Sequence, residues 1–188
     1  MLISEGGCTV IDDVLDFWLA EGMDRKWFFK DPVFDREVIE KLGPLYERAS
    51  ADELDHWADT AKGCLALCIL LDQAPRNLFR NDPKTFATDK KALEIAKKVV
   101  NKGWHTELPQ RERNFIFLPF EHSEDLAMQE KSLELYQHMD ENPDWLSYAH
   151  KHEVIIRRFG RFPHRNEVLG RESTPEEIEF LKQPGSSF

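Results

Sequence analysis

The stretch CLALCILL, residues 64–71, is apolar on every side of a helical wheel. Because a helix that is apolar all round is normally buried, this stretch predicts a helix at the centre of the core. It is far too short to span a bilayer, which takes about 20 residues. We therefore expect a globular, membrane-free protein built around this segment.

Helical periodicity continues on both sides of this centre. Between residues 10 and 19 the apolar side chains fall on one face of a wheel, opposite Asp12, Asp13 and Asp16. We find no alternating apolar and polar run long enough to predict a strand. The sequence therefore predicts an all-α fold of about eight helices, with short turns joining antiparallel neighbours. Periodicity alone leaves open whether they form a bundle or a stack of hairpins.

Capping signals and prolines give the expected helix boundaries in the first half of the chain. Asp31-Pro32 predicts the start of a helix that is broken or kinked at Gly43-Pro44. Ser50-x-x-Glu53 matches a capping box and predicts that the next helix starts there. That helix should stop near Gln73, since Pro75 disfavours a helical residue before it.

The same signals recur in the second half. Asp82-Pro83 predicts a helix that extends to about Asn101, and Pro119 predicts an interruption of the following one. Asn142-Pro143 and Thr174-Pro175 predict the last two helix starts. We expect the tail, residues 183–188, to be loose.

Composition limits the kind of protein. A length of 188 residues with 41% hydrophobic residues indicates one folded domain, residues 1–188. The formal net charge of −10 and pI near 5.2 argue against a nucleic-acid or anionic-membrane partner, because either would need a broad basic surface. Cys8, Cys64 and Cys68 form no disulfide framework, and no signal peptide is evident, so we expect a cytoplasmic protein.

Two polar residues fall on helix faces that should be buried. His152 lies in the middle of the apolar arc of its helix, so it is either a core histidine bonded to a carbonyl or carboxylate, or an acid/base or ligand-binding group. Asp89 projects between apolar residues and must be paired if it is buried. Arg76 and Arg80 are its nearest upstream partners in sequence.

The segment 119–125 brings Glu121, His122 and Glu124 together at the expected start of a helix. Acidic residues there interact favourably with the helix dipole, which gives them a structural explanation. The segment lacks a histidine pair at i, i+4 and every familiar metal-ligand spacing, so we expect no metal and no cofactor.

The most unusual segment is RRFGRFPHRNEVLGR, residues 157–171, which carries five arginines and a histidine in an acidic protein. Arginine donates a planar pair of hydrogen bonds that suits carboxylate or phosphate. The segment therefore predicts either an anion pocket or a set of structural ion pairs. In the structural alternative its arginines pair with Asp72, Asp89, Glu121 and Glu124.

Three segments together resemble a known family. LLDQAPRNLFRNDPKTFATDKKAL (70–93), FIFLPFEHSEDLAMQEKSLELY (115–136) and HKHEVIIRRFGRFPHRNEVLGRESTPEEIEFL (150–181) are similar to domain-of-unknown-function family 924 of bacteria. The resemblance implies a helical fold like that of tetratricopeptide (TPR) repeats, with antiparallel helices stacked as hairpins. It implies no activity.

Three hypotheses follow for the polar residues. They bind a small anionic ligand or an acidic peptide, or they form a buried structural network, or they belong to an enzyme in which a histidine acts as acid or base on an anionic substrate. The sequence leaves the oligomeric state open. The candidate site residues are Asp72, Arg76, Arg80, Asp89, Glu121, His122, Glu124, His152, Arg158, Arg161, His164, Arg165 and Asn166.

Overall fold

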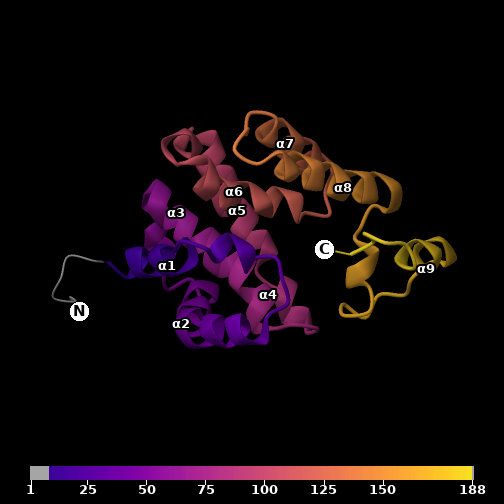
Figure 1. Cartoon of the computed structure of the whole chain (residues 1–188), viewed down its shortest axis with the longest axis horizontal. Coiled ribbons are helices and arrows are strands. Elements are labelled where there is room, and N and C mark those ends of the chain that lie inside the picture. Colours follow the sequence, from indigo (N-terminus) through magenta and orange to yellow (C-terminus); the bar gives the residue numbers. More distant parts are fainter. Residues whose placement is uncertain (1–8, 188) are drawn as a thin grey trace.

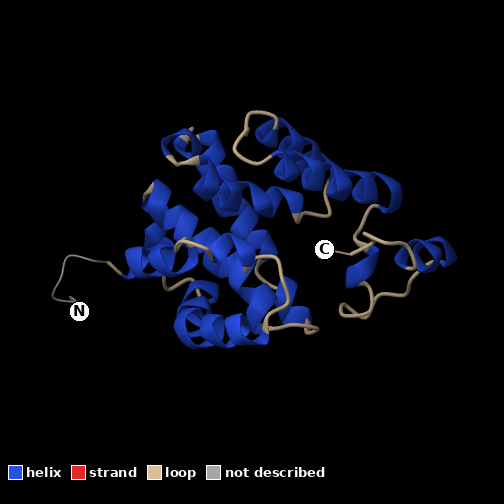
Figure 2. Ribbon diagram, viewed as in Figure 1, coloured by secondary structure: helices blue, strands red, loops and turns tan. Residues whose placement is uncertain are grey.

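A computed structural model describes residues 9–187, and these residues form helices and loops with no strand (Figure 2). The all-α prediction is therefore confirmed. The helices are α1 (Val10–Trp18), α2 (Pro32–Ser50), α3 (Ala61–Cys68), α4 (Ala74–Leu78), α5 (Asp89–Asn101), α6 (Gln110–Glu121), α7 (Leu126–Tyr136), α8 (Pro143–Phe159) and α9 (Pro175–Leu181). Short 3₁₀ turns lie between several of them.

The stretch 64–71 lies at the centre of the molecule, as its composition predicts. All of its side chains are fully buried, and α3 packs against α1, α5 and α6. Cys64 and Cys68 are free thiols in this core, whereas Cys8 lies outside the described residues. None of the helices in residues 9–187 is long and apolar enough to cross a membrane.

The helical structure does not end at Gln73, contrary to the prediction made from Pro75. It passes instead through a π-helical turn, Ile69–Gln73, directly into α4. The physical reason is the missing N–H of Pro75, which leaves the carbonyl of Leu71 without its i+4 donor. The Thr88 hydroxyl donates to that carbonyl at 2.5 Å, and the Ala74 N–H bonds to the carbonyl of Ile69. The wider turn rotates Asp72 and the residues after it relative to α3.

Other predicted boundaries were wrong for similar local reasons. Ser50 is the last residue of α2, where its hydroxyl donates to the carbonyl of Glu47, so it opens no helix. Asp82 caps a short 3₁₀ turn, Pro83–Phe86, and α5 begins only at Asp89. Neither Pro44 nor Pro119 ends its helix, since α2 and α6 continue through them.

Consecutive helices α5, α6, α7 and α8 pack side by side, and α2 packs on α4 (Figure 1). The right-handed, TPR-like order of these pairs stays a prediction. The chain after α8 forms a separate end of the molecule, with the turn Pro163–Arg165 and α9 around a small core of Ile155, Ile156 and Phe162. The tail then returns toward the middle, where Ser186 is buried while its neighbours are exposed, and the expected looseness of this tail stays a prediction.

Candidate functional site

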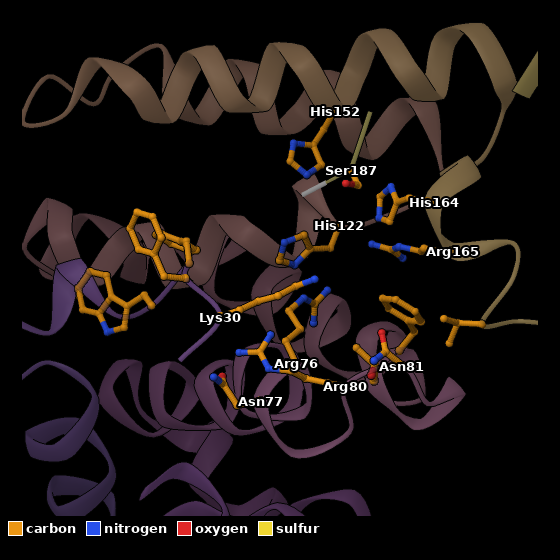
Figure 3. A pocket seen from close by; sticks show the side chains of 16 residues that line it. Lys30, Arg76, Asn77, Arg80, Asn81, His122, His152, His164, Arg165 and Ser187 are labelled. Carbon is orange, nitrogen blue, oxygen red and sulfur yellow. The ribbon is translucent and has the colours of Figure 1, made fainter. Parts of the chain in front are cut away.

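A cavity of about 380 Å³ lies where the α1–α2 connection, α4, the end of α6, α8 and the turn Pro163–Arg165 meet. Figure 3 shows its labelled polar side chains converging from opposite sides. Candidate residues from three distant parts of the sequence thus meet in one place. The lining residues are Trp27, Phe28, Phe29, Lys30, Arg76, Asn77, Arg80, Asn81, Thr85, Phe86, His122, His152, His164, Arg165, Val168 and Ser187.

The charges of this lining are one-sided. Four of the residues are the cations Lys30, Arg76, Arg80 and Arg165, and none of the described lining residues is Asp or Glu. In a protein with a net charge of −10 this is an unusual local excess of positive side chains. The carboxylates that pair with the arginines, Asp35, Asp72 and Asp89, are not among the lining residues.

Asp89 joins two of these arginines. Arg76 donates to both of its carboxylate oxygens at 3.2 and 3.4 Å, and Arg165 Nη1 donates to Oδ2 at 3.3 Å. Arg76 Nη1 also lies 3.5 Å from the carboxylate of Asp72, one helical turn earlier. These bonds fix both guanidinium groups, because an arginine held by carboxylates loses most of its rotational freedom. The expected Asp89–Arg76 bridge is therefore present.

Arg80 is held by a residue that the sequence analysis did not select. Asp35 on α2 accepts two hydrogen bonds from Arg80, at 2.6 Å from Nε and 2.6 Å from Nη2. Asp35 also accepts from the side chain of Asn77 at 2.8 Å. Although burial opposes it, the bonds from Arg80 and Asn77 lower the pKa of Asp35, so it stays ionised. Arg80 therefore does not share Asp89 with Arg76.

His122 and Asp72 form a directed pair. His122 Nδ1 lies 2.8 and 2.9 Å from the two carboxylate oxygens of Asp72, which is fully buried. Burial favours the neutral carboxyl, but Arg76 and His122 together lower the pKa of Asp72. An ionised carboxylate only accepts hydrogen bonds, so His122 Nδ1 carries the proton. In the neutral imidazole, Nε2 then has the free lone pair.

His152 has the second such arrangement. Its Nδ1 lies 2.9 Å from the carbonyl of Tyr148 and 3.0 Å from Oε1 of Glu121. Burial, reinforced by the negative charge of Asp72, raises the pKa of Glu121 to about 8. Burial and the neighbouring His122 keep the pKa of His152 well below its usual value. Near neutral pH this pair is therefore an uncharged histidine beside a protonated carboxyl group.

Arg165 and His164 complete the wall from the C-terminal side. The guanidinium of Arg165 lies 4.5 Å from the ring centres of both Phe86 and Phe162. Burial lowers the pKa of Arg165 to about 10, which leaves it charged at neutral pH. Burial and then the charge of Arg165 lower the pKa of His164 to about 4. His164 is consequently neutral in the physiological range.

Four predicted site residues lie outside the lining and tie the C-terminal segment together. Glu124 accepts two bonds from Arg171, at 2.7 and 2.9 Å, and one from the backbone N–H of Phe162. Both carboxylate oxygens of Glu177 lie 2.7 Å from Arg161, and Asn166 donates to Glu177 at 3.3 Å. Arg158 pairs at 2.9 Å with Glu176, whose side chain is largely exposed.

The arrangement thus divides the thirteen candidates into three groups. Six line the cavity, and three carboxylates, Asp72, Asp89 and Glu121, pair with four of those six, namely Arg76, His122, His152 and Arg165. The remaining four belong to the C-terminal network. Sequence reasoning missed Lys30, Asp35 and the aromatic residues 27–29 because they lie in or near a connection without helical periodicity. Within residues 9–187, no group of three or more His, Cys, Asp or Glu side chains could hold a metal ion.

Comparison with known proteins places the chain in a family. The model of the bacterial proteins of unknown function called DUF924 matches residues 14–185. The chain belongs to the DUF924 family. The match covers every described residue of the cavity lining except Ser187, so the cavity is built from the family's domain.

A solved structure agrees with this fold. The protein of unknown function ATU0120 from Agrobacterium tumefaciens is 40% identical, with a TM-score of 0.87 over 92% of this DUF924 chain and 97% of that chain. No curated protein matches the sequence. The family and this neighbour thus support the fold, and the function must be argued from the cavity itself.

Proposed function

We propose that this protein binds a small organic or inorganic anion in the cavity, as a cytoplasmic binding protein. The observation that carries the proposal is the lining, with four cations, three histidines and no described acidic residue. The volume of about 380 Å³ suits a small molecule. Buried free thiols at Cys64 and Cys68 are consistent with the reducing cytoplasm.

Three ion pairs reduce the net charge of the site, but the groups that line the cavity are still the positive ones. Asp35, Asp72 and Asp89 pair with Arg80, Arg76 and Arg165, and only the arginine of each pair belongs to the lining. Arg165 is only 7% exposed, and its Nε has no hydrogen-bond partner among the described residues. A buried donor without a partner is costly, so the negative charge of an anion bound beside this guanidinium would be stabilising.

Lys30 provides the sharpest test. It is exposed and makes no ion pair among the residues that the structure describes, so its truncation should leave the fold intact. We expect Lys30→Ala to weaken the binding of inorganic phosphate roughly tenfold, because a charge-assisted hydrogen bond contributes about 1.5–3 kcal/mol. Isothermal titration calorimetry measures this directly. Lys90→Ala, an exposed lysine outside the cavity, is the matched control and should change the affinity less than about twofold.

A thermal-shift panel gives the broader check. Phosphate, sulfate and small carboxylates that bind only the native state should raise the melting temperature, and the rise should grow with the logarithm of concentration above the dissociation constant. An acidic peptide that raises it while every small anion fails would redirect the proposal toward a peptide site. If nothing in the panel binds the wild-type protein more tightly than about 10 mM, anion binding is the wrong function.

A second candidate function is acid/base catalysis on the bound anion. It is favoured by one observation, the buried Asp72 that holds His122 by Nδ1 beside the cavity. Asp72 also lies in the π-helical turn, and such turns are frequent at functional sites. His122 Nε2 would accept a proton from water or a hydroxyl group, and the arginines would stabilise the developing negative charge.

His122→Asn and Asp72→Asn test this second candidate. With 4-nitrophenyl phosphate and 4-nitrophenyl acetate as substrates, we expect wild-type turnover to fall by about 10²–10⁴ in His122→Asn. Its phosphate affinity should stay close to that of the wild type. Asp72→Asn should also move the acidic limb of the pH–rate profile, because Asp72 sets the protonation of His122. Binding of phosphate without turnover of either ester would leave only the binding function.

A further inference from the structure

The cavity is larger than a simple anion requires. Its volume of about 380 Å³ equals that of about a dozen water molecules in the liquid. A phosphate or carboxylate group held by Arg76 and Arg165 fills only part of that space. The ligand of such a cavity therefore has a second portion, whose chemistry must match the rest of the lining.

Besides its cations, histidines and small polar side chains, the lining has an apolar part that is mostly aromatic. Trp27, Phe28, Phe29 and Phe86 contribute rings, together with the aliphatic side chain of Val168. Aromatic side chains pack best against other flat rings, in stacked or edge-to-face contacts. The lining thus has two chemically distinct parts, one cationic and one aromatic.

Two of these rings are left in water. Phe28 is 59% exposed and Phe29 67% exposed, although both belong to the cavity lining. Exposing two adjacent phenylalanine side chains to water is unfavourable unless a ligand or partner covers them. Exposed apolar patches of this kind mark binding sites. Lys30 follows them directly, and Figure 3 shows its side chain extending toward the same space as Arg76 and His122. One short connection therefore supplies both a cation and two uncovered rings.

Phe86 lies at the boundary between the cationic and the aromatic parts of the lining. Its ring centre lies 4.5 Å from the guanidinium of Arg165, which Phe162 holds from a second direction at 4.5 Å. Arg165 cannot swing away from this position, since Asp89 also holds its Nη1. One ring of the aromatic part, Phe86, is therefore adjacent to the anion-binding group, and Phe28 and Phe29 line the same cavity.

We propose that the ligand is an anion attached directly to a planar ring, in the class of aryl phosphates and aryl carboxylates. The charged group binds at Arg76, Arg165 and Lys30, and the ring packs against Phe28, Phe29 and Phe86. The inference rests on the proposed anion-binding function and specifies its ligand class. It differs from that function in predicting a preference for rings over chains of similar size.

Three probes separate these contributions by calorimetry. We expect phenyl phosphate to bind at least tenfold more tightly than inorganic phosphate, and also more tightly than hexyl phosphate, which has the same number of carbons. The Phe28→Ala/Phe29→Ala variant should lose most of the advantage of phenyl phosphate and keep the affinity for inorganic phosphate within twofold. Both side chains are exposed, so this variant should fold normally.

Two further variants sharpen the test. Phe28→Leu/Phe29→Leu keeps apolar bulk but removes the rings, and it should bind phenyl and hexyl phosphate equally. Tyr148→Ala removes an aromatic side chain of similar exposure, 48%, outside the cavity and should change nothing.

Each failure has a distinct meaning. Equal affinities for phenyl phosphate and inorganic phosphate, or for phenyl and hexyl phosphate, would overturn the aryl class while anion binding stands. A change of oligomeric state in the double alanine variant, with phenyl phosphate affinity intact, would assign the rings to a protein contact and overturn the proposal. Absence of binding by every probe would remove both this inference and the proposed function.

Discussion

At the scale of single residues, the site depends on the hydrogen bonds and ion pairs that orient each polar side chain of the lining. His122 bonds through Nδ1 to Asp72, which is not a lining residue, so Nε2 of His122 is the nitrogen available to a ligand, and His152 bonds through Nδ1 to the carbonyl of Tyr148. The arginines follow the same rule, with their carboxylate partners outside the lining. The sequence singles out these polar residues on apolar faces, but it does not show which nitrogen or which carboxylate each one uses.

Glu121 gives the clearest prediction at this scale. Its pKa of about 8 in the folded protein exceeds the unfolded value of 4.5, so its contribution to stability is complete below pH 4.5 and is lost as the pH rises toward 8. Relative to Glu121→Gln, the wild type should lose up to roughly 1.4 kcal/mol of unfolding free energy per pH unit in that window. Urea unfolding of both proteins across the window measures the difference. A difference that does not vary with pH would show that Glu121 ionises normally.

At the scale of elements, Pro75 and Glu177 show how tertiary contacts modify a local pattern. Pro75 was expected to stop a helix, but the Thr88 hydroxyl satisfies the carbonyl that Pro75 leaves free, so the helix continues with a π-helical turn. The capping box Thr174-x-x-Glu177 opens α9 as the sequence predicts. Glu177 also binds Arg161 and Asn166, which no local rule indicates.

Two arginines, one at the end of α8 and one just after it, bind carboxylates of α9 and provide a matched pair of tests. Arg161 donates two hydrogen bonds to Glu177, which is only 2% exposed, so Arg161→Ala leaves this carboxylate without its cation and should cost clearly more stability than the loss of a surface pair. Arg158 binds Glu176, whose side chain is 63% exposed, so Arg158→Ala should cost less than about 1 kcal/mol. Urea denaturation of both variants tests the contrast. Similar losses in the two would contradict the structural role given to Arg161.

At the scale of the whole molecule, the cavity lies between two hydrophobic cores of unequal size. The large core extends from α1 to Ala149 in α8, and the small one holds Ile155, Ile156 and Phe162. Polar contacts cross between them at Arg165–Asp89 and Arg171–Glu124. A ligand bound at Arg76 and Arg165 would add a further connection between the two parts.

Hydrogen exchange should report this connection. We expect amides of the segment 163–181 to exchange faster than those of α3 and α6, because a small core gives less protection than a large one. Saturating phosphate should slow exchange in 163–181 and leave α2 unchanged, since α2 contributes no residue to the lining. Uniform slowing along the chain, or none in 163–181, would contradict a ligand that links the two cores.

The sequence by itself determined the helical class, the buried centre at residues 64–71 and the set of polar residues worth following. These depend on periodicity, capping and composition, which act within one or two helical turns. Only the tertiary structure decided which arginines face the cavity and which hold α9, and it alone added Lys30, Asp35 and the exposed Phe28 and Phe29. Ion pairing and burial depend on distances between residues far apart in the chain, and the same Arg and Asp residues fit several pairings until the packed helices select one.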